Sequence, residues 1–582
     1  MSFQLSHLCG GLFLSFLLTS IVFAGSPDIE RIAPKEVPSD VGGELIQDDL
    51  PDVVPSPDRD AVLVDALKGI VFIDDASKLD PSGRGHASGI VTDGDLDITD
   101  VSVFKKYFDE FLNQPITLNL LDGITHAVVR YYRQHDRPIV DALAPEGQDI
   151  TDGVLQIAVI LGKRGDVRVE GAEYFSADKL VGNVRLKVSE TITQAELEED
   201  IAWMNNNPFR TVDILFERGK EFSETDIVLD VEDRFPLRVY GGVEDSGTEL
   251  TGKRRWLSGF NWGNAFGLDH QLNYQFTSSL DIDVLNAHSF NYKAPLPWRH
   301  TASLFGAYVK SDPATTSGGF NLDGENYQLG FRYNIPLSKY KKLNHELALG
   351  YDFKRSNNNL EFGGLSVFST FTNVSQFSVA YNGSVKDKYG ATSFGSTVNV
   401  SPGDMMGDNR DIEFAASRAL ASADYIYSRF NFNRVTRLPF EFSWLAELQF
   451  QVSNKNLLGS EQFGIGGYQT IRAYDAYAAV GDEGIIIKNE IRSPAMVLLK
   501  HLKIEVPKEE LQFLWFLDYG SVNNVDLLAG EGGTDLMSTG VGVRYSIAPY
   551  LTVRSDYGWQ LKKLSATDSL DSRLHIGFVL AY

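Results

Sequence analysis

The sequence of 582 residues contains one cysteine, Cys9, which lies in the first 24 residues. The rest of the chain therefore has neither a disulfide nor a cysteine metal ligand, and its stability must come from burial and backbone pairing. Basic residues are also in deficit: 53 Lys and Arg against 78 Asp and Glu leave a net charge of −25. Such a chain cannot neutralise an extended phosphate backbone, which excludes a general nucleic-acid binder.

Long apolar runs and catalytic motifs are missing as well. Beyond the N-terminus no apolar run reaches the roughly 18 residues of a conventional transmembrane helix. There is no H-E-x-x-H, no phosphate-binding glycine loop, no G-x-S-x-G and no cysteine pair, and the ten histidines are scattered. We expect no catalytic residue, no metal and no cofactor, so the protein is not predicted to be an enzyme.

The N-terminal segment has the features of an export signal. Residues 1–24 lack Asp, Glu, Lys and Arg, and the apolar core Leu12–Phe23 ends in Val22-Phe23-Ala24, with small residues where a signal peptidase cleaves. A buried N-terminal strand or helix is the alternative. Residues 25–60 hold six prolines among acidic side chains, which predicts an extended, solvated linker or tail.

Residues 61–163 and 164–235 are predicted to be two small α+β domains. In the first, strands and helices alternate around a Gly/Ser/Asp-rich loop that runs to about Asp97. The expected elements are a strand at Leu67–Ile73, a helix capped by Thr99 or Asp100, a helix after Thr117, and strands at Pro138–Leu143 and Val154–Leu161.

The same types of element recur in the second stretch. We expect a strand at Val167–Val169, a helix at Ser176–Val181, a helix behind a Thr193/Glu196 capping box, and strands at Val212–Phe216 and Ile227–Val231. A single, unrelated α+β domain remains the alternative for residues 61–235.

From residue 236 to 582 the helical period gives way to alternation with a period of two. In Tyr327–Ile335 the odd positions are apolar or aromatic and the even positions are polar or glycine. Connections at 386–389, 437–440 and 547–550 are short, whereas 356–373, 401–417 and 525–539 are long and polar. Alternating short turns and long loops are typical of a membrane β-barrel. The count is sixteen antiparallel strands, with a large soluble β-protein as the alternative.

An even strand count puts both barrel ends on the periplasmic side, where the two small domains must also lie. The last strand, Arg573–Tyr582, has apolar residues on one face and ends in an aromatic residue. Such an ending is expected of barrels that are delivered to the outer-membrane assembly machinery.

The loop 453–483, the sixth on the outer side, is rich in glycine and carries Arg472. Glycines allow the sharp folding required of a loop that turns back into its own barrel. Alternation along the thirteenth strand directs Phe516, Asp518 and Gly520 into the lumen. We therefore expect Arg472 to pair with Asp518 and fasten the loop to the inner wall; an Arg472 in solvent, unrelated to Asp518, is the alternative.

Two motifs carry a resemblance to a known family. Ile471-Arg472-Ala473-Tyr474 resembles the (Val/Ile)-Arg-Gly-(Phe/Tyr) motif, and Phe516-Leu517-Asp518-Tyr519-Gly520 resembles the Phe-x-Asp-x-Gly motif, of outer-membrane transporters with POTRA domains and a sixteen-stranded barrel. Within this superfamily the chain most resembles the two-partner secretion transporters (TpsB family), which are relatives of the haemolysin and filamentous haemagglutinin exporters. The resemblance includes the number of modules, two rather than five.

The resemblance implies that POTRA domains in the periplasm recognise an unfolded, TpsA-like exoprotein and that the barrel translocates it to the surface. The expected partners are the lipid bilayer of the outer membrane and the barrel-assembly machinery, which would bind the strand ending at Tyr582. The transporter is expected to be a monomer. An outer-membrane assembly or insertion factor of the same superfamily is the alternative, and a diffusion porin would leave residues 61–235 unexplained.

The sequence departs from the family pattern in two places. Ala473 stands where the family has glycine, so the backbone there is not expected to use φ > 0 freely. Residues 25–57 contain no proline-free stretch long enough for the N-terminal plug helix that many members have.

Overall fold

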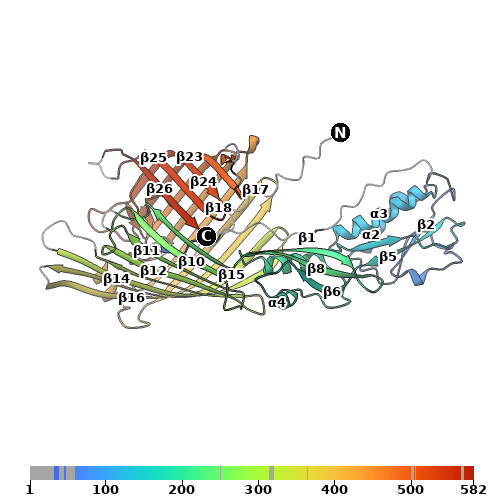
Figure 1. The fold of residues 1–582 in the computed structure, drawn as a ribbon, viewed down its shortest axis with the longest axis horizontal. Coiled ribbons are helices and arrows are strands. Elements are labelled where there is room, and N and C mark those ends of the chain that lie inside the picture. The colour runs from blue at the N-terminus through green and yellow to red at the C-terminus, as the bar shows by residue number, and fades with distance from the viewer. Residues whose placement is uncertain are drawn as a thin grey trace. The chain divides into compact units, whose positions relative to one another are not determined.

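The computed structural model describes residues 32–37, 45–46, 59–248, 251–312, 320–362, 365–499, 504, 506–564 and 569–582. The chain forms two compact units, Val41–Arg234 and Met1–Asp40 together with Phe235–Tyr582 (Figure 1). The predicted signal peptide lies outside the described residues, as does most of the predicted linker.

The first α+β module contains a four-stranded sheet in the order β3-β2-β5-β4. Its strands are β2 (Gly69–Ile73), β3 (Gly89–Asp93), β4 (Val140–Leu143) and β5 (Val154–Leu161). Helices α2 (Val101–Phe108) and α3 (Leu118–Gln134) supply Phe104, Phe108, Val128 and Tyr131 to one core with the sheet. Among the helices of the described residues, none is long and apolar enough to cross a membrane.

The helix caps predicted for this module are confirmed, whereas strand β3 was not predicted. The Asp100 side chain accepts hydrogen bonds from the backbone of Ser102 and Val103, which makes it the N-cap of α2, and Thr117 caps α3. Strand β3 lies inside the stretch predicted to be a loop. It escaped detection because only Ile90 among its five residues is buried, so no periodic pattern marks it.

The second module is built on a sheet in the order β1-β7-β8-β6. Its elements are β1 (Leu45–Ile46), β6 (Lys163–Glu170), α4 (Ala177–Val181), α5 (Gln194–Met204), β7 (Arg210–Arg218) and β8 (Glu224–Asp233). The predicted capping box does not form, since Thr193 makes no side-chain bond to the start of α5. Asp136 of the first module replaces it, accepting from the Ala195 N–H at 2.6 Å.

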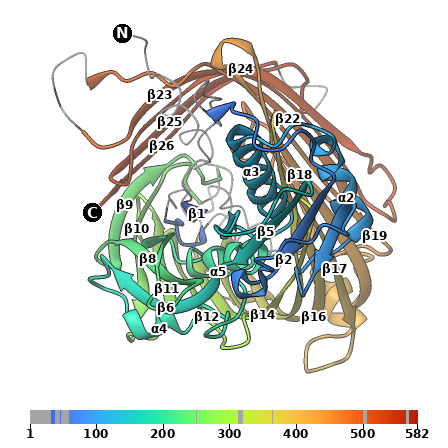
Figure 2. The ribbon, with the colours of Figure 1, turned by 90° about the vertical axis from the view of Figure 1, so that its right-hand side faces the viewer.

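Sixteen antiparallel strands form a closed barrel, as predicted, in which β9 pairs with both β10 and β26 (Figure 2). The strands are β9 (Leu237–Glu244), β10 (Arg255–Ala265), β11 (His270–Ser279), β12 (Leu285–Pro295), β13 (Thr301–Ser311), β14 (Phe320–Tyr340), β15 (Leu343–Phe362), β16 (Leu365–Asp387), β17 (Gly390–Pro402), β18 (Asp424–Arg437), β19 (Ser443–Ser453), β22 (Glu483–Arg492), β23 (Glu509–Asn523), β24 (Thr534–Ile547), β25 (Leu551–Gln560) and β26 (Ser572–Ala581).

The two faces of the wall differ as the alternation predicts. On β14, Leu329 and Phe331 are exposed on the outside, whereas Gln328 and Arg332 are buried on the inside. On β23, Trp515 faces outward while Asp518 is fully buried. An apolar exterior over a polar interior is the arrangement that a bilayer requires, and closure leaves no unpaired strand edge in lipid.

Three expected outer loops contain regular structure. Residues 356–373 continue strands β15 and β16, whose registered pairs run to Phe362 and Leu365. Helix α6 (Asp411–Ser417) lies in the second loop, and β24 begins at Thr534 in the third. These segments were predicted to be loops because the strand extensions are largely polar and therefore lack the apolar face that identifies a strand in sequence.

Candidate functional site: a loop fastened inside the barrel

The loop between β19 and β22 folds back against the inner wall of the barrel. A short hairpin of β20 (Phe463–Ile465) and β21 (Ala479–Gly481) supports it. Gly466 and Gly467 have φ values of 107° and 93°, which L-residues with a side chain rarely adopt. A Cβ at Gly466 would also collide with the carbonyl of Asp475, so the sharp bend at this point requires glycine.

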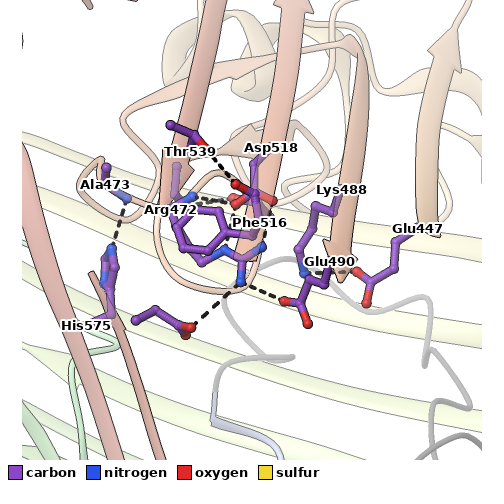
Figure 3. Close-up of polar contacts among 12 residues, drawn as sticks. Glu447, Arg472, Ala473, Lys488, Glu490, Phe516, Asp518, Thr539 and His575 are labelled. Atoms are coloured by element: carbon purple, nitrogen blue, oxygen red, sulfur yellow. Dashed lines mark hydrogen bonds and ion pairs between the residues drawn. The ribbon is translucent and has the colours of Figure 1, made fainter. Parts of the chain in front are cut away.

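Arg472, at the tip of the loop, binds Asp518 through a two-pronged contact (Figure 3). Its Nε and Nη2 each donate to one carboxylate oxygen of Asp518, both at 2.7 Å, and its backbone N–H donates to Oδ2 at 3.2 Å. The two side chains are 1 % and 0 % exposed. The predicted pairing is therefore present, and the alternative of a solvated arginine does not apply.

The arginine has further partners that the sequence analysis missed. Its Nη1 donates to Glu490 of β22 at 2.6 Å, and its guanidinium carbon lies 3.6 Å from the ring centroid of Phe516. Asp556 of β25 is 3.8 Å from Nη1. Charged residues stand at alternate positions 488, 490 and 492 of β22 and therefore face the lumen. This alternation could have predicted that Glu490 lies inside the barrel.

These contacts belong to a larger network of ion pairs on the lumen wall. Arg492 and Arg472 share Glu490, Arg544 binds Asp556, and Lys488 binds Glu447. The network thus pairs four basic with four acidic side chains across neighbouring strands. Because each buried charge has a partner, the site avoids the cost of an isolated charge.

The residues on either side of Arg472 seat the loop by packing. Ile471 and Tyr474 are buried in an apolar cluster with Ile465, Ile486, Val522 and Leu536. Gly520 leaves the space that Ile471 fills, since a Cβ there would lie 2.9 Å from Ile471 Cγ1. The Tyr474 hydroxyl donates to the carbonyl of Met537 at 2.9 Å. All seven predicted site residues are therefore brought together on one side of the lumen.

Ala473 behaves differently from the expectation. Its φ is 73°, so the backbone keeps the left-handed conformation that a glycine would adopt, despite the Cβ. The conformation is held by two bonds: the Ala473 N–H donates to His575 Nε2 at 3.2 Å, and its carbonyl accepts from Gln560 at 2.9 Å. Placing an alanine there costs about 1–2 kcal/mol, which the surrounding contacts offset.

We predict that Ala473→Gly strengthens the seating of the loop. Removing the Cβ relieves the left-handed strain of about 1–2 kcal/mol. Because glycine loses more conformational entropy on folding than alanine, the net gain in folding free energy is about 0.5–1 kcal/mol. The temperature at which the barrel loses its compact form on semi-native gels should rise by a few degrees. An unchanged or lower transition would show that the methyl group, packed beside Gly558, contributes at least as much as the strain costs.

Two further ion pairs hold the base of the loop. Asp482, fully buried, receives two donors from Arg418 at 2.6 and 3.1 Å and the backbone N–H of Leu457 at 2.9 Å. Glu461 binds Lys354 of β15 at 2.6 Å and Tyr427 at 2.8 Å. Sequence reasoning did not find these anchors, because each partner comes from a distant strand or loop.

Part of the predicted linker lies inside the barrel instead of in solvent. Ile32 is buried against Leu285, Ala287 and Ala307, and Lys35 binds Glu244 of β9 at 2.9 Å. The composition of residues 25–60 predicted a solvated chain, and for Ile32–Val37 this was wrong. The doubted plug helix concerns residues that lie mostly outside the described part of the chain.

Comparison with known proteins identifies the architecture that these contacts belong to. Residues 223–545 match the family of haemolysin secretion/activation proteins ShlB/FhaC/HecB. The chain belongs to this family. It is therefore an outer-membrane transporter of the two-partner secretion type, with its POTRA domains in the periplasm.

Individual relatives are distant. The chain is 23 % identical over 453 residues to the heme/hemopexin transporter protein HuxB of Haemophilus influenzae, covering 75 % of this chain and 77 % of that protein. It is 23 % identical over 434 residues to the outer membrane transporter CdiB-2 of Burkholderia pseudomallei, covering 72 % and 69 %. The structure of CdiB from Escherichia coli superposes with a TM-score of 0.70 at 16 % identity, covering 89 % and 91 %, which supports the fold.

Proposed function

We propose that the POTRA domains bind an exoprotein in unfolded form in the periplasm and that the barrel passes it to the cell surface. The observation that carries this proposal is the fastening of loop 453–483 inside the lumen by Arg472, through charged contacts to Asp518 and Glu490. A loop held by polar bonds can exchange them for contacts with a passing chain.

Direction is supplied by the exported chain itself. Export in this way needs no enzymatic step and no cofactor, and the glycine-loop motif that binds nucleoside triphosphates does not occur in the sequence. A domain that folds outside the cell gains about 5–15 kcal/mol, which prevents its return through the barrel. The transporter acts as a monomer in this scheme, and its strand ending at Tyr582 is presented to the barrel-assembly machinery during biogenesis.

Deleting the gene distinguishes a transporter that exports one protein from an assembly factor that inserts outer-membrane proteins in general. For an exporter, deletion removes one large protein from the culture medium or cell surface and leaves the outer-membrane proteome unchanged. Quantitative mass spectrometry of both fractions measures this. A general loss of outer-membrane barrels would instead support an assembly factor, and unchanged secretion of every protein would exclude the export function.

A further inference from the structure

A short part of the N-terminal segment lies against four neighbouring strands of the barrel wall, β9, β10, β11 and β12 (Figure 2). Each strand contributes one polar side chain that bonds to a main-chain N–H or C=O of residue 32 or 35. We call these four residues the wall site: Tyr240, Asn261, Gln275 and Ser289.

The wall site binds this segment as a neighbouring backbone would. Gln275 Nε2 donates to the carbonyl of Ile32 at 3.1 Å, and its Oε1 accepts from the Lys35 N–H at 3.3 Å. The Tyr240 hydroxyl accepts from the same N–H at 3.0 Å, and Asn261 Nδ2 donates to the Lys35 carbonyl at 2.9 Å. A carboxamide carries both a donor and an acceptor, as a peptide group does. Because these bonds use main-chain groups, they can form with any polypeptide that presents an N–H and C=O at this spacing.

Two side chains of the segment also have their own places on the wall. Ile32 lies in an apolar hollow formed by β12 and β13. Lys35 Nζ is 2.9 Å from a carboxylate oxygen of Glu244, a residue that is 4 % exposed and also accepts from Arg554 at 3.0 Å. The wall therefore favours a chain with an apolar residue that is followed, three positions later, by a basic one.

The wall site has hydrogen bonds of its own, which do not depend on the segment. Asn261 Nδ2 donates to Asn273 at 2.8 Å, and Gln275 Nε2 donates to the Thr277 hydroxyl at 3.0 Å. Gln275 Oε1 accepts from the Tyr240 hydroxyl at 3.1 Å. Leaving a buried polar group without any partner costs about 1–3 kcal/mol. Since these amides keep a partner within the wall, one chain can leave and another can bind without that cost.

We propose that the wall site binds the main chain of the exoprotein inside the lumen, and that residues 32–35 of the transporter occupy it between export events. The inference rests on the proposed function and names a contact site within the barrel for the exported chain. Its ligand is an extended polypeptide with an apolar residue and, three positions on, Lys or Arg. An unfolded chain has free N–H and C=O groups, whereas a folded domain has already paired them, so the site distinguishes the two.

Substitutions on the two sides of the same contact test the proposal in the full-length transporter. Gln275→Leu removes a donor and an acceptor from the wall, and we expect export to fall at least about five-fold. Lys35→Ala weakens the contact from the side of the segment and leaves the wall intact, so export should equal or exceed that of the unsubstituted transporter. If the wall only held residues 32–37, both variants would release the segment and would change export in the same direction.

The matched control is Gln328→Leu, the same substitution at a buried, inward-facing residue of β14. It lies three strands from β11 in the barrel and should export normally. The heat-dependent shift of the barrel on gels shows that each variant has assembled, and export is measured as exoprotein in the medium.

A binding measurement tests main-chain recognition without any change to the wall. The probe is a fluorescent peptide with the sequence of residues 30–39, added to the purified Lys35→Ala transporter and followed by fluorescence anisotropy. A second peptide has an ester oxygen in place of the Lys35 N–H, which removes the donor for Tyr240 and Gln275 but keeps every side chain. We expect the ester peptide to bind at least about ten-fold more weakly, because two acceptors then face an oxygen.

The outcomes separate this inference from the exporter function. Export by Gln275→Leu at or above the level of Gln328→Leu would overturn the wall site, as would an equal loss of export in Lys35→Ala. Equal binding of the two peptides would show that the main chain is not recognised and would overturn it as well. Each of these results leaves the exporter function standing, whereas a gene deletion without effect on secretion would remove both.

Discussion

Arg472→Ala is expected to abolish export while the barrel still assembles. The substitution leaves Asp518 and Glu490 buried without their main partner, and breaking a buried pair in this way costs about 3–5 kcal/mol. The loop loses its attachment to β23, whereas the strand ladder of the barrel is untouched. Export is measured as exoprotein in the medium, and assembly as the heat-dependent shift of the barrel on gels.

Two further variants make this result specific. Arg472→Lys keeps the charge but cannot form the two-pronged contact, so we expect export well below that of the unsubstituted transporter. Arg434→Ala removes an arginine that binds Asp387 at a short turn of the barrel, away from the loop, and should export normally. Export by Arg472→Ala at the level of the Arg434→Ala control would refute the role of the fastened loop.

Locking the loop tip to the wall is expected to stop export as completely as releasing it. A Cβ on Gly558 would lie 3.0 Å from the Cβ of Ala473, close to the roughly 3.8 Å of a disulfide, so Ala473→Cys with Gly558→Cys should cross-link after a small adjustment. If the loop must leave the wall for the exoprotein to pass, export by the oxidised variant falls below detection and returns on reduction.

The controls for the lock are the two single cysteine variants, which carry the same packing changes without the cross-link. Both should export at a level that reductant does not alter. Formation of the bond is followed by the difference in gel mobility with and without reductant. Full export through a barrel whose loop tip is shown to be cross-linked would mean that the chain passes beside a stationary loop, and the exchange of polar contacts would then play no part.

The sequence predicted side-chain positions best in the barrel wall, where side chains alternate between the lipid and the polar lumen. The parity along β23 placed Asp518 in the lumen because Trp515 and its outward neighbours had to face lipid. The pairing of Arg472 with Asp518 was predicted from this parity, the glycine-rich loop and charge together, since a buried guanidinium requires a carboxylate. The same reasoning did not reach Glu490 or Asp556, because parity shows that a side chain is inside but not which neighbour it meets.

The misreadings have a common physical origin. Ala473 was not expected to adopt a positive φ, because the preference of an isolated residue opposes it. Its N–H donates to His575 and its carbonyl accepts from Gln560, and these two hydrogen bonds hold that conformation. The helix α5 begins without its predicted capping box because Asp136 supplies the acceptor from the neighbouring module. In each case a contact between distant residues outweighs a local preference of about 1–2 kcal/mol.

By itself the sequence determined the closed sixteen-stranded barrel, the inside and outside of its wall and one of the partners of Arg472, Asp518, because alternation and charge are local properties that a bilayer enforces along every strand. Only the tertiary structure decided where the proline-rich N-terminal segment lies. Lys35 meets Glu244 across 209 positions, and Leu45 meets Ile214 on a sheet edge. The composition of that segment shows that it cannot fold alone; which surfaces it covers depends on sites that exist only once the barrel and the sheet have formed.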